Sequence, residues 1–220
     1  MKINEKTLGG ILVLIGTFLY ILATIFHGNP PIEKASTAIP FVAEQTFWQT
    51  KHFINIIAIL LWLFGFICIF FNLSRQSSRL MAKIALTQFT ITTTIFAIYF
   101  YIHGFGLTQI ANKWQNAPST EKQNILLQGD AILNILGTTA FISQLFLGIS
   151  IILIALVFIF EKNVNKTYTI IGIIIGLGWA IGAYLINFAI IVPFTLLSWV
   201  WLILLIINIM KNQKNDLKQK

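Results

Sequence analysis

The stretch from Tyr168 to Met210 contains 43 consecutive residues and not one charged side chain among them. A single straight helix of that length would extend about 65 Å, roughly twice the thickness of a bilayer's hydrocarbon core. The stretch therefore predicts two membrane spans joined by a turn. We place the turn at Pro193, because proline interrupts a helix and Asn187 comes just before it, and the spans at residues 168–187 and 194–210.

Four further apolar runs precede this stretch. In Ile84–His103 no residue before the final histidine is charged, and the run follows the basic residues Arg75, Arg79 and Lys83. A helix of this length covers about 30 Å, which matches the hydrocarbon core. The four predicted spans share this apolar character and comprise residues 8–26, 52–71, 84–103 and 131–160.

Two longer polar segments, residues 28–51 and 104–125, are expected to be loops between spans. Near the end of the second, Pro118-Ser119-Thr120-Glu121 is typical of a helix start, with Ser119 as the N-cap. We therefore expect the fourth helix to begin near Thr120, outside the membrane.

The composition supports one membrane domain. The chain is 57% hydrophobic and only 10% charged, whereas a soluble domain carries about 25% charged residues. It lacks the charged residues needed to cover a water-facing surface. We predict an all-α polytopic transmembrane bundle of six spans in residues 1–210, followed by a polar cytoplasmic tail in residues 211–220.

The distribution of charge predicts the orientation. Six spans put both termini on one side, where eleven basic residues face three acidic ones, while the other side has four of each. By the positive-inside rule both termini are cytoplasmic (N-in/C-in) in a multi-pass protein of the cell membrane. The net charge of +8 is then a matter of topology, so no nucleic-acid partner is inferred. The lipid bilayer is the expected partner, and a homo-oligomer or another membrane protein stays open.

Polar side chains gather at the predicted extracytoplasmic level. His27, His52 and His103 fall at the ends of the first three spans, and Asp130 falls at the start of the fourth. Unpaired polar groups are costly in lipid, so they are expected to turn inward and meet. The neighbouring candidates for cofactor binding lie on the same helices and are Tyr20, Tyr99, Asn55 and Asn134.

Three imidazoles and one carboxylate could bind a metal ion. They match a zinc site with an open position for water, which would permit hydrolysis at the membrane surface. Copper also accepts imidazole ligands, and two facing histidines can ligate haem iron beside Tyr20 and Tyr99. Whether the protein is an enzyme stays open.

Other interpretations of the same residues need no cofactor. A histidine at the end of a span can reach the lipid headgroups, and asparagines between spans can hydrogen-bond neighbouring helices. Histidine and aspartate near water could also pass protons in a small transporter. A non-catalytic accessory or structural membrane protein would use its polar residues for helix packing alone.

Several short motifs give the chain a family resemblance. They are His27-Gly28-Asn29-Pro30, Trp48-x3-His52, the glycine-rich stretch at residues 168–179, and Trp199-Val200-Trp201-Leu202. In these motifs and in its layout, the chain resembles uncharacterised bacterial six-span integral membrane proteins. The resemblance implies a helical bundle in the bacterial cytoplasmic membrane and implies no particular reaction.

Overall fold

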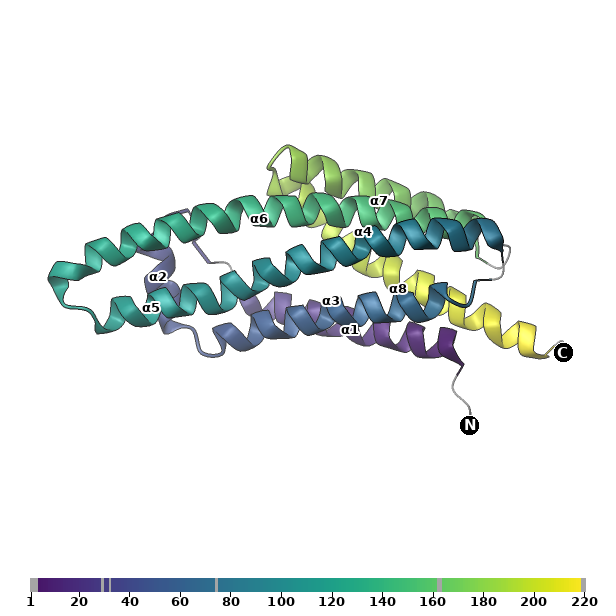
Figure 1. The fold of residues 1–220 in the computed structure, drawn as a ribbon, viewed down its shortest axis with the longest axis horizontal. Coiled ribbons are helices and arrows are strands. Elements are labelled where there is room, and N and C mark those ends of the chain that lie inside the picture. Colours follow the sequence, from purple (N-terminus) through teal and green to yellow (C-terminus); the bar gives the residue numbers. More distant parts are fainter. Residues whose placement is uncertain (1–3, 29, 32, 74, 162–163, 219–220) are drawn as a thin grey trace.

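The computed structural model describes residues 4–28, 30–31, 33–73, 75–161 and 164–218, and within them every regular element is helical (Figure 1). The chain runs through the following elements in order: α1 (Glu5–His27), α2 (Ala35–Glu44), α3 (Trp48–Phe70), α4 (Gln76–Tyr101), the π-helix η1 (Ile102–Gly106), α5 (Leu107–Asn116), α6 (Ser119–Ile159), α7 (Lys166–Tyr184) and α8 (Phe188–Lys218).

Among the described residues, six helical segments are long and apolar enough to cross a membrane, with α4, η1 and α5 forming one continuous segment, Gln76–Asn116. The start of α1 and the end of α8 lie at the same end of the bundle (Figure 1). This arrangement confirms the predicted all-α bundle of six spans. The protein is therefore a multi-pass membrane protein.

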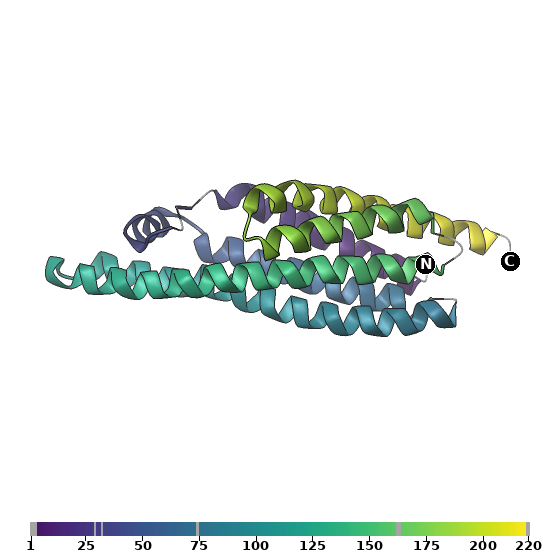
Figure 2. The ribbon, with the colours of Figure 1, turned by 90° about the horizontal axis from the view of Figure 1, so that it is seen from above.

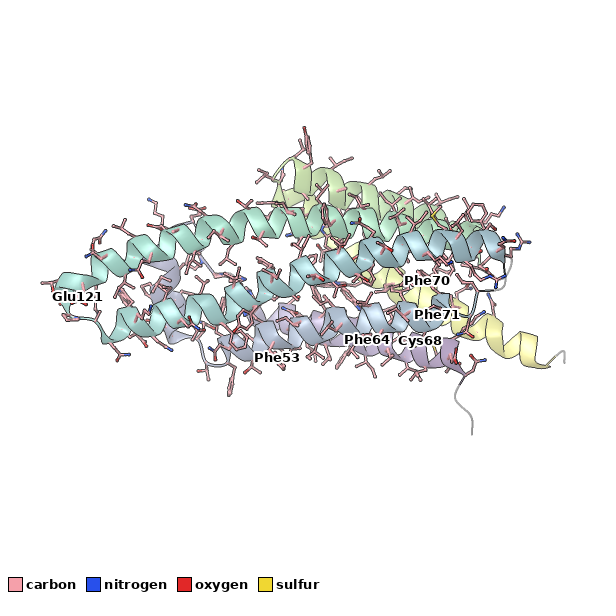
Figure 3. All side chains as sticks on the ribbon, in the orientation of Figure 1. Phe53, Phe64, Cys68, Phe70, Phe71 and Glu121 are labelled. Carbon is pink, nitrogen blue, oxygen red and sulfur yellow. The ribbon has the colours of Figure 1, made fainter. Side chains whose placement is uncertain are left out.

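The outer faces of the bundle are apolar. On α3, Phe53 and Phe64 project from the helix with 51% of each side chain exposed (Figure 3). On α7, Ile170 and Ile174 are 58% and 55% exposed. Large apolar side chains along every long helix would be costly in water, so these faces indicate a lipid environment.

Glycines let two pairs of helices pack backbone to backbone. A methyl group at Gly9 of α1 would lie 2.5 Å from the carbonyl oxygen of Gly65 on α3, and one at Gly148 of α6 would lie 2.7 Å from that of Gly176 on α7. Only glycine permits such approaches. Small residues at helix interfaces are the usual means of association in lipid, where apolar surface alone provides little driving force.

Two hydrophobic cores form among the residues that the structure describes. The larger lies among the long helices, and the smaller, here called the outer core, joins α2 and α5 to the first turns of α3 and the outer half of α6. The 41-residue segment Gln76–Asn116 is about 62 Å long, which exceeds a bilayer. The α5–α6 turn extends well past the α7–α8 turn (Figure 2), and the outer core lies in this projecting part.

The two segments expected to be loops each contain a short helix, α2 or α5. Their apolar residues recur at helical spacing and face the outer core: Ala35, Ala38, Ile39 and Val42 in α2, and Leu107, Ile110 and Ala111 in α5. Each helix buries only one narrow stripe of apolar side chains, and its other residues are polar. Both segments therefore have a polar composition overall.

Three local expectations differ from the structure. Ser119 is the first residue of α6, and Pro118 stands at the N-cap without a side-chain bond. The turn before the last span lies at residues 185–187, and Pro193 is inside α8, which begins at Phe188. Asn187 starts that helix instead, because its Oδ1 accepts a hydrogen bond of 2.9 Å from the Ala189 N–H. Helix α8 continues through the first residues of the predicted tail, to Lys218.

Candidate metal centre

Three histidines from three different elements converge at the end of the bundle away from the termini. His27 is the last residue of α1, His52 lies in the second turn of α3, and His103 lies in η1. One ring nitrogen from each lies within 4.8 Å of the other two. His52 is completely buried and His103 is 5% exposed, while His27 is partly buried.

His27 and His52 meet through their Nε2 atoms, which are 3.1 Å apart. On the other side of each ring, Nδ1 faces a backbone carbonyl. His52 Nδ1 lies 2.8 Å from the Trp48 oxygen, and His27 Nδ1 lies 3.1 Å from the Gly28 oxygen. A carbonyl only accepts hydrogen bonds, so these contacts assign the hydrogen of each ring to Nδ1.

The two Nε2 atoms are then both acceptors, and their lone pairs face each other. Two acceptors at 3.1 Å repel unless a positive species is shared between them or one ring instead carries its hydrogen on Nε2 and donates it to the other. Tetrahedral zinc, with Zn–N bonds of 2.0–2.1 Å, spaces its ligand nitrogens about 3.3 Å apart. The observed spacing is therefore close to the edge of a metal coordination polyhedron.

A shared proton is another way to relieve this repulsion. It would create a buried imidazolium, which is costly without a carboxylate partner. Among the described residues, the converging set contains histidines alone, with no Asp or Glu. The chemistry of the donor set therefore fits a metal ion better than a proton.

A π-helix and a glycine bring His103 to the other two rings. In η1 the helix widens by one residue at Ile102–Gly106, a distortion frequent at functional sites. The ring centroids of His52 and His103 are 4.4 Å apart. Next to His103, a methyl group at Gly104 would lie 2.6 Å from the His52 Cβ. A side chain at this position would force the two histidines apart.

Trp48 supports all three histidines. Its indole Nε1 donates a hydrogen bond of 2.9 Å to the His103 carbonyl oxygen, and its own carbonyl accepts from His52 Nδ1. Its ring centroid lies 4.8 Å from that of His27. The sequence shows only that Trp48 precedes His52 by one helical turn, so its role as a brace could not be anticipated from spacing.

The structure places two predicted residues away from this group. Asp130 Oδ1 accepts a hydrogen bond of 2.7 Å from the Ala35 N–H, at the first residue of α2. A carboxylate there stabilises the helix N-terminus. Asn134 is exposed on α6 and does not line the cavity beside the histidines.

A cavity of about 200 Å³ adjoins the histidines. His27 and His103 line it together with three other predicted residues, Tyr20, Tyr99 and Asn55. A ligand in this cavity would have direct access to two of the three imidazoles, and a fourth coordination position could open into it.

Comparison with known proteins identified no relative of this chain. No family model matches the chain, and no curated protein or solved structure matches it significantly. What the protein does has to follow from the chemistry of its own residues.

Proposed function

We propose that this membrane protein binds one transition-metal ion, zinc or copper, through His27, His52 and His103. The observation that carries the proposal is the pair of Nε2 atoms 3.1 Å apart, each on a ring whose Nδ1 faces a carbonyl. Such second hydrogen bonds orient metal-bound histidines and leave the other nitrogen free to coordinate. Three neutral imidazoles suit zinc and copper.

The convergence of three rings favours a bare ion over haem. A haem iron has four positions filled by the porphyrin and takes at most two axial protein ligands. Here the three ring nitrogens lie within 4.8 Å of one another, which leaves no room for a macrocycle between them.

The proposed orientation puts the metal at the extracytoplasmic side. The end of α1 and the start of α3, which carry His27 and His52, lie away from the start of α1 and the end of α8 (Figure 1), and the basic residues cluster near the termini. With both termini in the cytoplasm of a bacterial cell, the protein would take its metal from outside the cytoplasmic membrane.

Elemental analysis of the detergent-purified protein tests the proposal. The chain has only three histidines, so a purification tag without histidine leaves the centre as the sole imidazole site. We expect about one zinc or copper per chain, and loss of that metal in His52→Ala and His103→Ala. Asn134→Ala, an exposed change outside the cavity, is the matched control and should keep the metal.

Two results would contradict the proposal. One is a wild-type protein that stays free of metal after incubation with zinc and with copper. The other is equal metal content in the histidine variants and in Asn134→Ala.

A further inference from the structure

The cavity beside the histidines reaches the outside of the bundle between α1 and α8. Thr24 on α1 and Val192 on α8 both line it. Thr24 is exposed and Val192 is 53% exposed, so these two residues form its rim, here called the mouth. Further inward the same two helices are in contact, because the rings of Tyr20 and Trp199 pack with their centroids 6.1 Å apart. The cavity therefore opens sideways, near one end of both helices.

The mouth lies in an apolar surface. Thr24 belongs to the first predicted span, and Val192 belongs to the stretch of 43 residues without a charge. Beside the mouth, Ile25 and Phe26 are each 66% exposed, and Phe188, which also lines the cavity, is 46% exposed. Exposed apolar side chains of this size indicate contact with lipid. A molecule that passes the mouth would therefore come from the bilayer.

One helical turn separates the mouth from the metal centre. Thr24 precedes His27 by three residues on α1, and the Cβ atoms of such positions are about 5–6 Å apart on one helix face. His27 and His103 line the same cavity, so a fourth coordination position there would open toward the mouth. A cavity of about 150 Å³ holds benzene, and this cavity of about 200 Å³ accommodates one ring and a few further atoms.

The wall of the cavity offers aromatic surface more than free hydrogen-bonding groups. The hydroxyl groups of Thr24 and Thr195 donate to carbonyls of their own helices at 2.8 and 3.0 Å. The Trp179 indole N–H donates to Gln144. A bound metal would then be the strongest polar attraction for a ligand, and ring contacts would supply the rest. The aromatic residues of the wall are Tyr20, Phe96, Tyr99, Phe100, Trp179 and Phe188.

We infer that the cavity takes a small lipid-soluble aromatic molecule from the bilayer, and that an oxygen atom of this molecule coordinates the metal. Its ring packs against the aromatic wall, and the end of the ring opposite the oxygen points to the mouth. Zinc and copper both accept oxygen ligands beside imidazole. The inference rests on the proposed metal centre and adds to it the class of ligand and the route of entry.

Titration of the cobalt-loaded full chain in detergent tests the inference. Cobalt(II) can replace zinc, and its visible absorption changes when its coordination changes. The probe is 4-methylbenzohydroxamic acid, whose oxygens bind metals. The comparison is 4-carboxybenzohydroxamic acid, which has the same metal-binding group but carries a charge at the far end of the ring. We expect the charged compound to bind at least about tenfold more weakly, because its carboxylate would have to enter apolar surroundings.

Two variants narrow the mouth without removing a metal ligand. Val192→Trp places an indole at the mouth from α8, and Thr24→Trp does so from α1. Both should keep cobalt and bind 4-methylbenzohydroxamic acid at least about tenfold more weakly, since the ring then meets a filled entrance. Val200→Trp is the matched control. It makes the same change on the same helix, at a residue that is 56% exposed and does not line the cavity, and it should bind as the wild type does.

The inference and the proposed metal centre fail in different ways. A wild-type protein that takes up no cobalt, zinc or copper would remove the centre and the inference together. Cobalt uptake without a spectral change on adding 4-methylbenzohydroxamic acid would keep the centre and overturn the inference. Equal binding of the two hydroxamic acids, or equal affinities of Val192→Trp, Thr24→Trp and Val200→Trp for the methyl compound, would also overturn it, because the ligand would then reach the metal by another route.

Discussion

Gly104 and His52 are in such close contact that a methyl group on residue 104 would lie 2.6 Å from the His52 Cβ and 3.0 Å from its Cγ. The glycine lies next to His103 in the π-helix, so the fit between these two residues determines how closely the imidazoles of α3 and η1 approach. The geometry of the centre thus depends on the lack of a side chain at Gly104 as well as on the three histidine rings.

Gly104→Ala should therefore weaken metal binding without removing a ligand. Displacing a supporting contact typically costs 10- to 100-fold in metal affinity, and we expect at least about tenfold here, measured by competition with a zinc-binding dye. Gly106→Ala is the matched control, because its methyl group would meet Ile102 Cγ2 at an ordinary 3.4 Å. Equal zinc affinities in the two variants would show that the close contact does not govern the centre.

Trp48→Phe should weaken the centre through the backbone of η1. The change keeps an aromatic ring but leaves the His103 carbonyl oxygen without the indole hydrogen bond of 2.9 Å. An unsatisfied buried acceptor costs about 1–3 kcal/mol, which denaturant unfolding would detect together with weaker zinc binding. Trp114→Phe, on α5 in the outer core, provides the comparison. Zinc affinity that falls no further in Trp48→Phe than in Trp114→Phe would mean that the brace is unimportant.

Asp130→Ala should loosen α2 and leave the metal in place. The carboxylate is the acceptor for the Ala35 N–H, and loss of such a cap costs about 0.5–2 kcal/mol. Hydrogen exchange should therefore become faster in residues 35–44, while metal content stays that of the wild type. Loss of metal in Asp130→Ala with unchanged exchange in α2 would instead make this residue a ligand, as its sequence position alone had indicated.

The orientation can be tested by labelling single cysteines. Cys68 is the only native cysteine, so Cys68→Ser provides the background. In spheroplasts of a bacterial host, an impermeant maleimide should label Glu121→Cys, at the α5–α6 end shown in Figure 3. It should label Arg79→Cys, near the termini, only after permeabilisation. The reverse pattern would place the histidines on the cytoplasmic side.

The six spans could be predicted because the bilayer imposes a simple rule on length and polarity. The short helices α2 and α5 follow no such rule. Each is stabilised by a narrow apolar stripe that needs a partner surface, such as Ala38 and Ile39 against the outer core, and that partner comes from distant parts of the chain. The turn predicted at Pro193 was wrong, because Asn187 provides a stronger helix start and proline is tolerated inside α8.

The grouping of the histidines followed from their positions at the ends of spans, since such positions share a depth in the membrane. Their contacts did not follow, because the π-helix that carries His103 has no distinct pattern in the sequence. Asp130 shows the same limit: its partner Ala35 is 95 residues away in the chain. The hydropathy of the sequence predicts how deep each residue lies in the membrane. Which residues touch at that depth depends on how each helix is rotated about its axis.

The outer core joins the centre to the part of the protein that extends past the α7–α8 turn. Phe41 of α2 packs against Trp48, with ring centroids 6.1 Å apart, and Trp48 in turn holds His52 and His103. Helices stabilised by a few buried side chains open more readily than a membrane core. We therefore expect a bound metal to leave at the rate at which α2 detaches. The outer core would then govern how long the metal stays, while the long helices govern whether the protein folds at all.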